Sequence, residues 1–429
     1  MMDDRRPYIY KTTDLGRTWT RISDGLPQDH PLAYAMSLAE NPNRQGMLFA
    51  GTGNALYYSL DDGGTWTPLK AGLPAAPVTW IVVPRLDHDV VVSTYGRGIY
   101  VLRDITMLEQ SDRGVADAPV RLYEPPTGFR LARSGSVAFT FALTTAPRDT
   151  LTLDVLDSTG AVVRSIRAAG RAGTNRVTWD LRHDGPHQVA LRTAAPDNPA
   201  IWDEPRFRKG TTRPILHWGI QGPQRTGPVA APGRYTFRLT VDGVAHTQPF
   251  RVVKDPAIAS SNADLAASTR TQVRIRDDMN SAVDMINRLE IMRRQVEEQR
   301  ASRSADGQTQ TALAELDGKL LGVELQLLSR SDLQSDDKWY VEGYRIYSNL
   351  LWLSGEVGTG AGDVAGGAEF RPTAASLATL SGIERDLAVA TSAFATLIDK
   401  EVPAFNMAMG GKMPPIRDTL PVAARALLP

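Results

Sequence analysis

Residues 10–20 read Tyr10-Lys11-Thr12-Thr13-Asp14-Leu15-Gly16-Arg17-Thr18-Trp19-Thr20, and the same pattern returns 47 residues later as Tyr57-Tyr58-Ser59-Leu60-Asp61-Asp62-Gly63-Gly64-Thr65-Trp66-Thr67. The tripeptide Gly-Leu-Pro at residues 25–27 returns at the same spacing at residues 72–74. Short runs of β-branched and aromatic residues lie at Met47–Ala50, Ala55–Ser59, Val78–Pro84, Val90–Thr94 and Ile99–Leu102. A repeat near this length, filled with short strands, is typical of the four-stranded blades of a β-propeller.

Each motif fits the pattern Ser/Thr-x-Asp-x-Gly-x-Thr-Trp, which predicts a tight hairpin turn. We expect Asp14 and Asp61 to accept hydrogen bonds from backbone N–H groups of the turn, which lowers the carboxylate pKa and favours a structural over a catalytic role. The glycines supply backbone freedom, and each tryptophan is expected to be buried between strands. The predicted structural residues are Thr12, Asp14, Gly16, Thr18, Trp19, Ser59, Asp61, Gly63, Thr65 and Trp66.

These motifs, together with the run Ser93–Asp104, resemble the C-terminal part of large bacterial BNR or Asp-box repeat proteins, which are glycosyl-hydrolase-like and similar to the N-terminal domain of sortilin. The resemblance implies a partial β-propeller over residues 1–108. Family members carry enough blades to close a ring, whereas residues 1–104 hold two Asp-box blades and a candidate closing strand. Two blades would expose apolar faces, so the sequence predicts an N-terminally truncated fragment, with association with a partner as the weaker explanation.

The composition excludes several classes of function. Lys plus Arg and Asp plus Glu both number 48, so no net charge draws the whole chain to nucleic acid or anionic lipid. The absence of cysteine excludes disulfides, thiolate nucleophiles and cysteine-based zinc sites. No segment reads as a signal peptide or a membrane span. The resemblance implies a secreted or periplasmic protein, whose export signal would lie on sequence outside this chain.

The middle of the chain, residues 118–254, shows alternating strand patterns joined by turn signals. The runs are Ser136–Leu143, Thr150–Leu156, Ala161–Ile166, Asn175–Asp180, Gly233–Gly243 and Gln248–Val253. This spacing predicts an immunoglobulin-like β-sandwich. Short segments of this sequence resemble the immunoglobulin-like domain of flagellar hook-capping proteins. The resemblance implies a spacer or interaction module.

A long loop, residues 184–231, interrupts the predicted sandwich. It places Trp202 and Trp218 among several arginines, and aromatic and arginine side chains together can stack on sugars or bases. The alternative is a loop held against the propeller or the helices by its aromatic residues. His183, His187 and His217 are too scattered to predict a metal site.

Residues 260–429 show helical periodicity. Apolar residues recur every three or four positions in four segments, around residues 279–296, 313–327, 339–351 and 377–397. Four amphipathic helices predict an α-helical bundle, and the charged residues of the first, from Glu290 to Arg300, are expected to form a solvated face. A Gly-rich loop lies at residues 355–367.

The residues for catalysis are unknown from the sequence. Glycoside hydrolysis needs two carboxylates facing a sugar, one with a raised pKa. The candidates near the predicted strands are Asp87, Asp89, Asp104 and Glu109, but no spacing selects a pair. Arg97, between Gly96 and Gly98, is a candidate residue for binding an anionic ligand. The alternative is that Arg97 is buried and paired with Asp104 or with a backbone carbonyl.

The fold class expected is therefore multidomain: a partial propeller, an immunoglobulin-like sandwich and a helical bundle. The function expected is that of a structural or ligand-binding fragment of a secreted propeller protein resembling glycosyl hydrolases. An active glycosidase acting on polysaccharide and a sortilin-like protein-binding scaffold are the alternatives, so enzymatic activity stays open. We expect no cofactor, no metal, no bound nucleic acid and no membrane span. The expected partner is a carbohydrate or a protein or peptide ligand.

Overall fold

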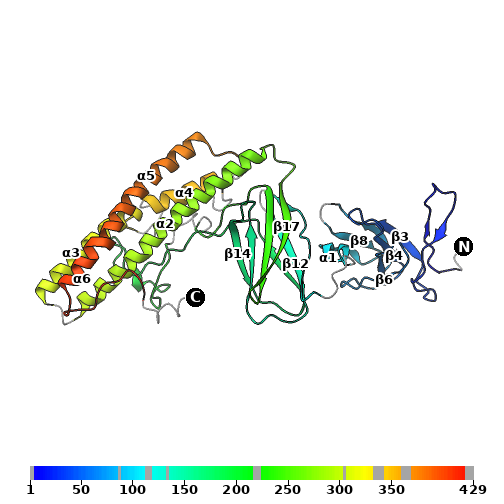
Figure 1. The fold of residues 1–429 in the computed structure, drawn as a ribbon, viewed down its shortest axis with the longest axis horizontal. Coiled ribbons are helices and arrows are strands. Elements are labelled where there is room, and N and C mark those ends of the chain that lie inside the picture. The colour runs from blue at the N-terminus through cyan, green and yellow to red at the C-terminus, as the bar shows by residue number, and fades with distance from the viewer. Residues whose placement is uncertain are drawn as a thin grey trace.

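The computed structural model describes residues 4–85, 88–111, 118–131, 135–215, 224–302, 306–331, 343–358 and 369–420. Small N-terminal sheets, a central pair of sheets and a group of long helices follow one another along the longest axis (Figure 1). The molecule is thus rich in β-structure over its first 254 residues and helical afterwards. The domain boundaries expected from the sequence stay a prediction.

The N-terminal part contains one hairpin and two sheets, all antiparallel and all in chain order. The hairpin is β1 (Tyr10–Lys11) and β2 (Thr20–Arg21); the four-stranded sheet is β3 (Ala35–Glu40), β4 (Leu48–Thr52), β5 (Leu56–Ser59) and β6 (Thr67–Pro68); the three-stranded sheet is β7 (Val78–Val82), β8 (Val90–Thr94) and β9 (Gly98–Leu102). The five apolar runs read from the sequence lie on β4, β5, β7, β8 and β9, with ends that agree to within two residues.

The four-stranded and three-stranded sheets repeat one another in detail. Both have a register shift at the same place, between Ala35 and Ser37 on β3 and between Val78 and Trp80 on β7. The sheets share a core, and Ser37 Oγ donates a hydrogen bond to the carbonyl oxygen of Val78 at 2.9 Å. A Cβ at Gly51 would lie 2.7 Å from Val78, so only glycine permits this close approach of β7 to β4.

A short helix, α1 (Thr106–Glu109), leads from the N-terminal sheets to the central part. Polar contacts join the two among the described residues: Arg176 Nη2 lies 3.2 Å from Asp104 Oδ2, and Gln110 binds the backbone of Glu124 and accepts from Arg121. The two parts have separate apolar cores.

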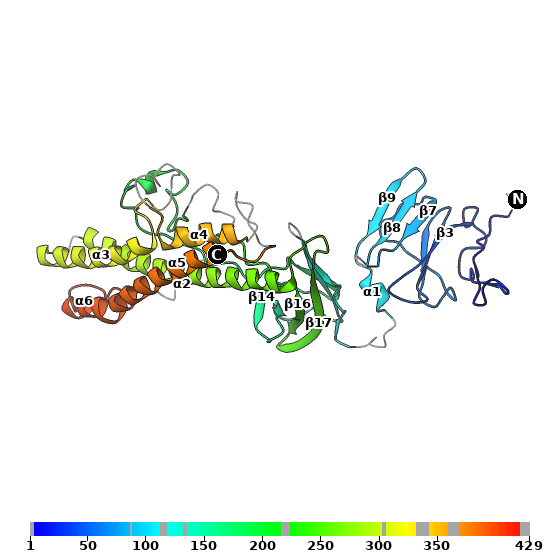
Figure 2. The ribbon, with the colours of Figure 1, turned by 90° about the horizontal axis from the view of Figure 1, so that it is seen from above.

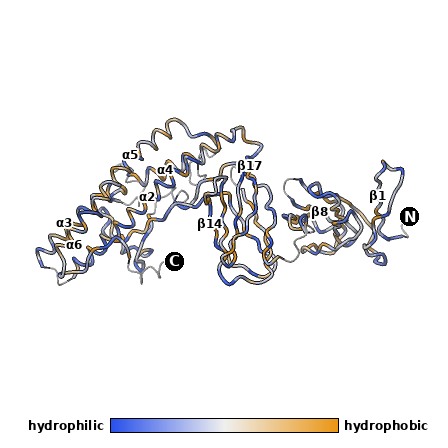
Figure 3. Tube along the Cα trace, in the orientation of Figure 1, coloured by the Kyte–Doolittle hydropathy of each residue, from blue (hydrophilic) through white to orange (hydrophobic). Residues whose placement is uncertain are grey.

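The central part consists of two sheets around one core. The first sheet contains β10 (Val120–Leu122), β12 (Val137–Leu143) and β15 (Gly173–Trp179); the second contains β11 (Gly128–Arg130), β17 (Val244–Lys254), β16 (Gly233–Val241), β13 (Leu151–Leu156) and β14 (Val162–Ala168). Phe139 of the first sheet stacks on Phe237 of the second at 4.2 Å between ring centroids, and Trp179 is fully buried beside Phe250. Along β16 buried residues alternate with more exposed ones, which is the pattern of a strand with one buried face. Figure 3 shows hydrophobic and hydrophilic segments mixed along these strands.

The C-terminal part is helical. Its helices are α2 (Asn262–Ala301), α3 (Gly307–Leu327), α4 (Ile346–Val357), α5 (Ala374–Thr396) and α6 (Val402–Ala408), with a π-helical turn, η3 (Leu397–Glu401), between the last two. The long helix α2 packs against α3, α4 and α5 (Figure 2). Ser261 caps α2 and forms a reciprocal capping box with Asp264. Trp339 and Tyr340, expected in the third apolar segment, lie outside the described residues.

Arg130 joins the central sheets to the helices. Its side chain is 1% exposed, and Nη1 donates at 3.1 Å both to the carbonyl oxygen of Ala230 and to Thr269 Oγ1 of α2. Its Nε lies 3.5 Å from the carboxylate of Glu369. A buried guanidinium shared in this way makes relative movement of the two parts costly.

Candidate binding site

The first hairpin turn is closed by one carboxylate and one hydroxyl. Asp14 Oδ1 accepts from the backbone N–H of Thr18 at 2.8 Å, and Oδ2 accepts from Thr18 Oγ1 at 2.7 Å. Thr12 Oγ1 donates to Asp14 at 2.9 Å and accepts from the N–H of Gly16 at 2.8 Å. The side-chain oxygens of Thr12, Asp14 and Thr18 are therefore all used within the turn.

The second hairpin repeats these bonds. Asp61 accepts from the N–H and Oγ1 of Thr65 at 2.8 and 2.7 Å, and Ser59 Oγ donates to Asp61 at 2.7 Å and accepts from the N–H of Gly63 at 2.9 Å. The hydrogen bond from the backbone of Thr65 holds the pKa of Asp61 below its ordinary value, and that from Thr18 does the same for Asp14. Both carboxylates are thus ionised acceptors without a proton to donate.

The two tryptophans of the repeat differ in burial. Trp66 is 7% exposed, and its Nε1 donates at 2.7 Å to the carbonyl oxygen of Ile22, in the segment that follows the first hairpin. Trp19 is 59% exposed, and its Nε1 donates back to Gly16 at 3.1 Å. The expectation that Trp19 is buried between strands is therefore wrong here: Trp66 is covered by the preceding repeat unit, and no described residue plays that part for Trp19.

The turn between β8 and β9 carries two protruding side chains, Tyr95 and Arg97. Thr94 Oγ1 donates to the carbonyl oxygen of Gly98 at 2.7 Å, as Thr52 Oγ1 does to that of Ala55 at 3.0 Å in the preceding sheet. Three residues lie between the bonded pair in the β8–β9 turn and two in the equivalent one. Both side chains of this longer turn lie in solvent: Tyr95 is 78% exposed and Arg97 is exposed.

This position excludes the alternative expected for Arg97. It is not buried, and it forms no ion pair with any described residue. Asp104, its expected partner, lies instead 3.2 Å from Arg176. The flanking Gly96 and Gly98 have φ of +79° and +85°, a conformation that glycine adopts without strain.

The candidate carboxylates near the N-terminal sheets are occupied by structural hydrogen bonds. Glu109 is 7% exposed, and its carboxylate lies 2.7 Å from His88 Nδ1 and accepts from Asn41 Nδ2 at 2.8 Å. Burial alone would raise the pKa of Glu109, but these partners outweigh it and the pKa is lowered. Asp89 accepts from the N–H of Asp104 at 2.8 Å. Asp87 lies outside the described residues.

The first part of the long loop runs extended along α2. Side chains of α2 bind its backbone in succession: Asn280 accepts from the N–H of His187 at 2.7 Å, and Asn287 accepts from the N–H of Ala190 at 2.8 Å. Asn287 also donates to the carbonyl oxygen of Gln188 at 3.0 Å. This part of the loop is therefore held on α2 by polar side chains of the helix.

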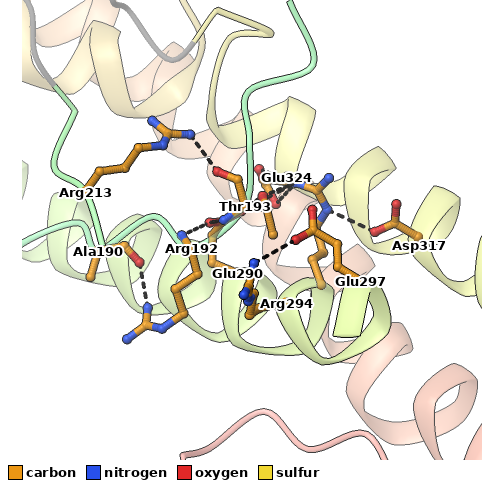
Figure 4. Close-up of polar contacts among 10 residues, drawn as sticks. Ala190, Arg192, Thr193, Arg213, Glu290, Arg294, Glu297, Asp317 and Glu324 are labelled. Carbon is orange, nitrogen blue, oxygen red and sulfur yellow. Dashed lines mark hydrogen bonds and ion pairs between the residues drawn. The ribbon is translucent and has the colours of Figure 1, made fainter. Parts of the chain in front are cut away.

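Further along α2, the contact between the loop and the helix contains a buried ionic cluster (Figure 4). Glu290, 1% exposed, accepts from the N–H groups of Arg192 and Thr193, the latter at 2.8 Å. Arg293, 5% exposed, donates to Thr193 Oγ1 at 3.0 Å and to Glu324 of α3 at 3.1 Å.

The expectation that Glu290 and Arg293 lie on a solvated face is therefore wrong. The loop covers this side of α2, which the periodicity of the helix alone could not reveal. A signal was present in the regular spacing of Asn280, Asn287 and Glu290, which places their side chains along one side of the helix.

Of the two tryptophans expected in a loop site, the structure describes Trp202. Trp202 lies in a short 3₁₀ turn, η1 (Ile201–Asp203), where the buried Arg213 approaches its ring at 5.9 Å. Trp218 and His217 lie outside the described residues. No group of three potential metal ligands occurs in the part of the chain that the structure describes. Within that same part, every helix is too short or too polar to cross a membrane.

Comparison with known proteins gives little. No family model matches the chain, and no curated protein does. Among solved structures, the extracellular domain of a hybrid two-component system from B. thetaiotaomicron matches with a TM-score of 0.20 and 9% identity over 58% of this chain and 29% of that one. The extracellular domain of a one-component system from the same organism matches with a TM-score of 0.15 and 10% identity over 52% and 25%. The chain spans under a third of either structure, and superpositions this loose do not assign a fold.

Proposed function

We propose that this chain is a binding part of a secreted propeller protein that resembles glycosyl hydrolases. In this proposal its N-terminal sheets are propeller blades, its central sheets an immunoglobulin-like spacer and its helices a bundle. The observation that carries the proposal is the pair of hairpins with the same hydrogen bonds, one of which lies in a sheet stacked face to face on the next. Face-to-face stacking of successive four-stranded sheets is the arrangement of propeller blades.

The contact point that we propose is the turn with Tyr95 and Arg97. An exposed aromatic ring can stack on the apolar face of a sugar, and a free guanidinium binds a carboxylate or sulfate through two parallel hydrogen bonds. The ligand that fits both is an acidic polysaccharide. Binding rather than hydrolysis fits the carboxylates, because the pKa values of Asp14, Asp61 and Glu109 are lowered, opposite to what a general acid requires.

A glycan array with uronic-acid, sulfated and neutral polysaccharides tests this function. We expect binding to the acidic glycans, lost in Tyr95→Ala and in Arg97→Ala and weakened by salt. The matched control is Arg17→Ala, an exposed arginine on the first hairpin turn, which should bind like the wild type. Binding that survives both substitutions in the β8–β9 turn, or an array without any bound glycan, would contradict the proposal. Release of reducing sugar by the wild type would favour the glycosidase alternative.

A further inference from the structure

The three-stranded sheet β7–β9 has one covered face and one open face. The open face consists of cross-strand neighbours that are apolar at all but one position: Trp80, Val82, Val91, Ser93, Ile99 and Val101. The exposed fractions of Trp80 and Ile99 are 68% and 72%. An exposed apolar face of this kind on a sheet marks an interaction surface.

The repeat shows what covers such a face. The shared register shift makes Ser37 equivalent to Trp80 and Leu56 equivalent to Ile99. On the four-stranded sheet this face is buried by β7 and β8; Leu56 is 4% exposed and packs in a core with Val78 and Val90. By this equivalence, the open face of β7–β9 fits the opposite face of another sheet or hairpin of the same repeat.

The opposite face of the four-stranded sheet is open in part: Leu48 and Ala50 are buried under the first hairpin unit, but the edge on β3 is not. Leu38, equivalent to the buried Ile81, is 49% exposed on β3. The first hairpin, which covers the rest of that face, in turn exposes Tyr10 and Trp19, at 51% and 59%, which are equivalent to Tyr57 and Trp66 in the motif. We name Trp80 with Ile99 the front face, and Trp19 with Leu38 the back face.

We propose that a second copy of this chain covers the front face with its back face, so that copies associate head to tail. Two complementary faces at opposite ends of one unit make a heterologous contact, which closes into a ring or continues as an open chain. The formal charge of the chain is zero at pH 7, so no net repulsion opposes this contact. This inference rests on the blade arrangement proposed above and goes beyond it.

The test measures the mass of the full chain by light scattering and sedimentation over a range of concentrations. The wild type should form assemblies whose mean mass rises with concentration. The front variant, Trp80→Arg with Ile99→Lys, and the back variant, Trp19→Arg with Leu38→Lys, should each be monomers, with dissociation constants raised about 30-fold or more, as for loss of a buried aromatic anchor. The control, Val162→Lys with Val244→Lys, changes exposed apolar residues of the central sheets and should associate like the wild type.

Mixing the two variants decides the geometry. The front variant keeps an intact back face and the back variant an intact front face, so an equimolar mixture should form dimers and nothing larger. A mixture that stays monomeric, a wild type that is monomeric at all concentrations, or a control that loses association would each overturn the proposal. Circular dichroism shows whether the variants fold. Retained glycan binding by the monomeric variants would separate failure of this inference from failure of the proposed function.

Discussion

At the scale of single residues, Trp19 and Trp66 occupy the same position of a repeated motif but differ in burial, and so in their contribution to stability. Trp66 is buried against the segment after the first hairpin, whereas most of the Trp19 ring faces solvent. Trp66→Ala should therefore lower the free energy of unfolding by about 3–5 kcal/mol. Trp19→Ala should change it by less than about 0.5 kcal/mol. Urea unfolding at low protein concentration measures both, and equal losses would show that the two environments are alike.

Asp278 on α2 gives a prediction about pH. Burial, with the carboxylate of Glu384 as the next cause, raises its pKa from 3.8 to about 6. Between these two values the folded chain holds the proton more tightly than the unfolded chain, so the free energy of unfolding falls as the pH rises through this window. Asp278→Asn should raise the Tm near pH 7 and change it little near pH 4. The exposed Asp386 provides the control, because Asp386→Asn should leave the Tm unchanged at either pH.

At the scale of elements, the long loop and α2 stabilise one another through the cluster around Arg293. Three carboxylates, those of Glu290, Asp317 and Glu324, lie within 3.4 Å of this guanidinium and raise its pKa against the effect of burial. Removing one partner of a buried ionic cluster leaves the others uncompensated.

Arg293→Met should therefore cost about 3–5 kcal/mol in chemical unfolding. It should also release the segment around Arg192, which trypsin would then cleave. The neighbouring Arg294 is half-exposed and pairs with Glu297 and Glu298 on the helix surface, so Arg294→Met should cost less than about 1 kcal/mol. Trypsin resistance of the Arg293 variant at this segment would show that the loop is held elsewhere.

At the scale of the whole molecule, the contacts between the three parts are unequal. The helices and the central sheets share the buried Arg130, whereas the described residues of the N-terminal sheets meet the central ones through polar contacts around Asp104 and Gln110. Calorimetry should therefore resolve at least two transitions. Trp66→Ala should shift one of them, and Arg130→Met the other. A single transition that both variants shift together would show that the parts unfold as one unit.

The sequence by itself determined the local structure. The repeated Asp14 and Asp61 motifs predicted their turns, and alternating or three-to-four-residue spacing placed the strands and helices, because these signals act between residues close in the chain. Burial of Trp66 but not Trp19, and of Glu290 and Arg293, was decided only by the tertiary structure. Each depends on a segment many residues away that either does or does not cover the side chain, and a periodic pattern shows which side of an element is apolar without showing what lies against it.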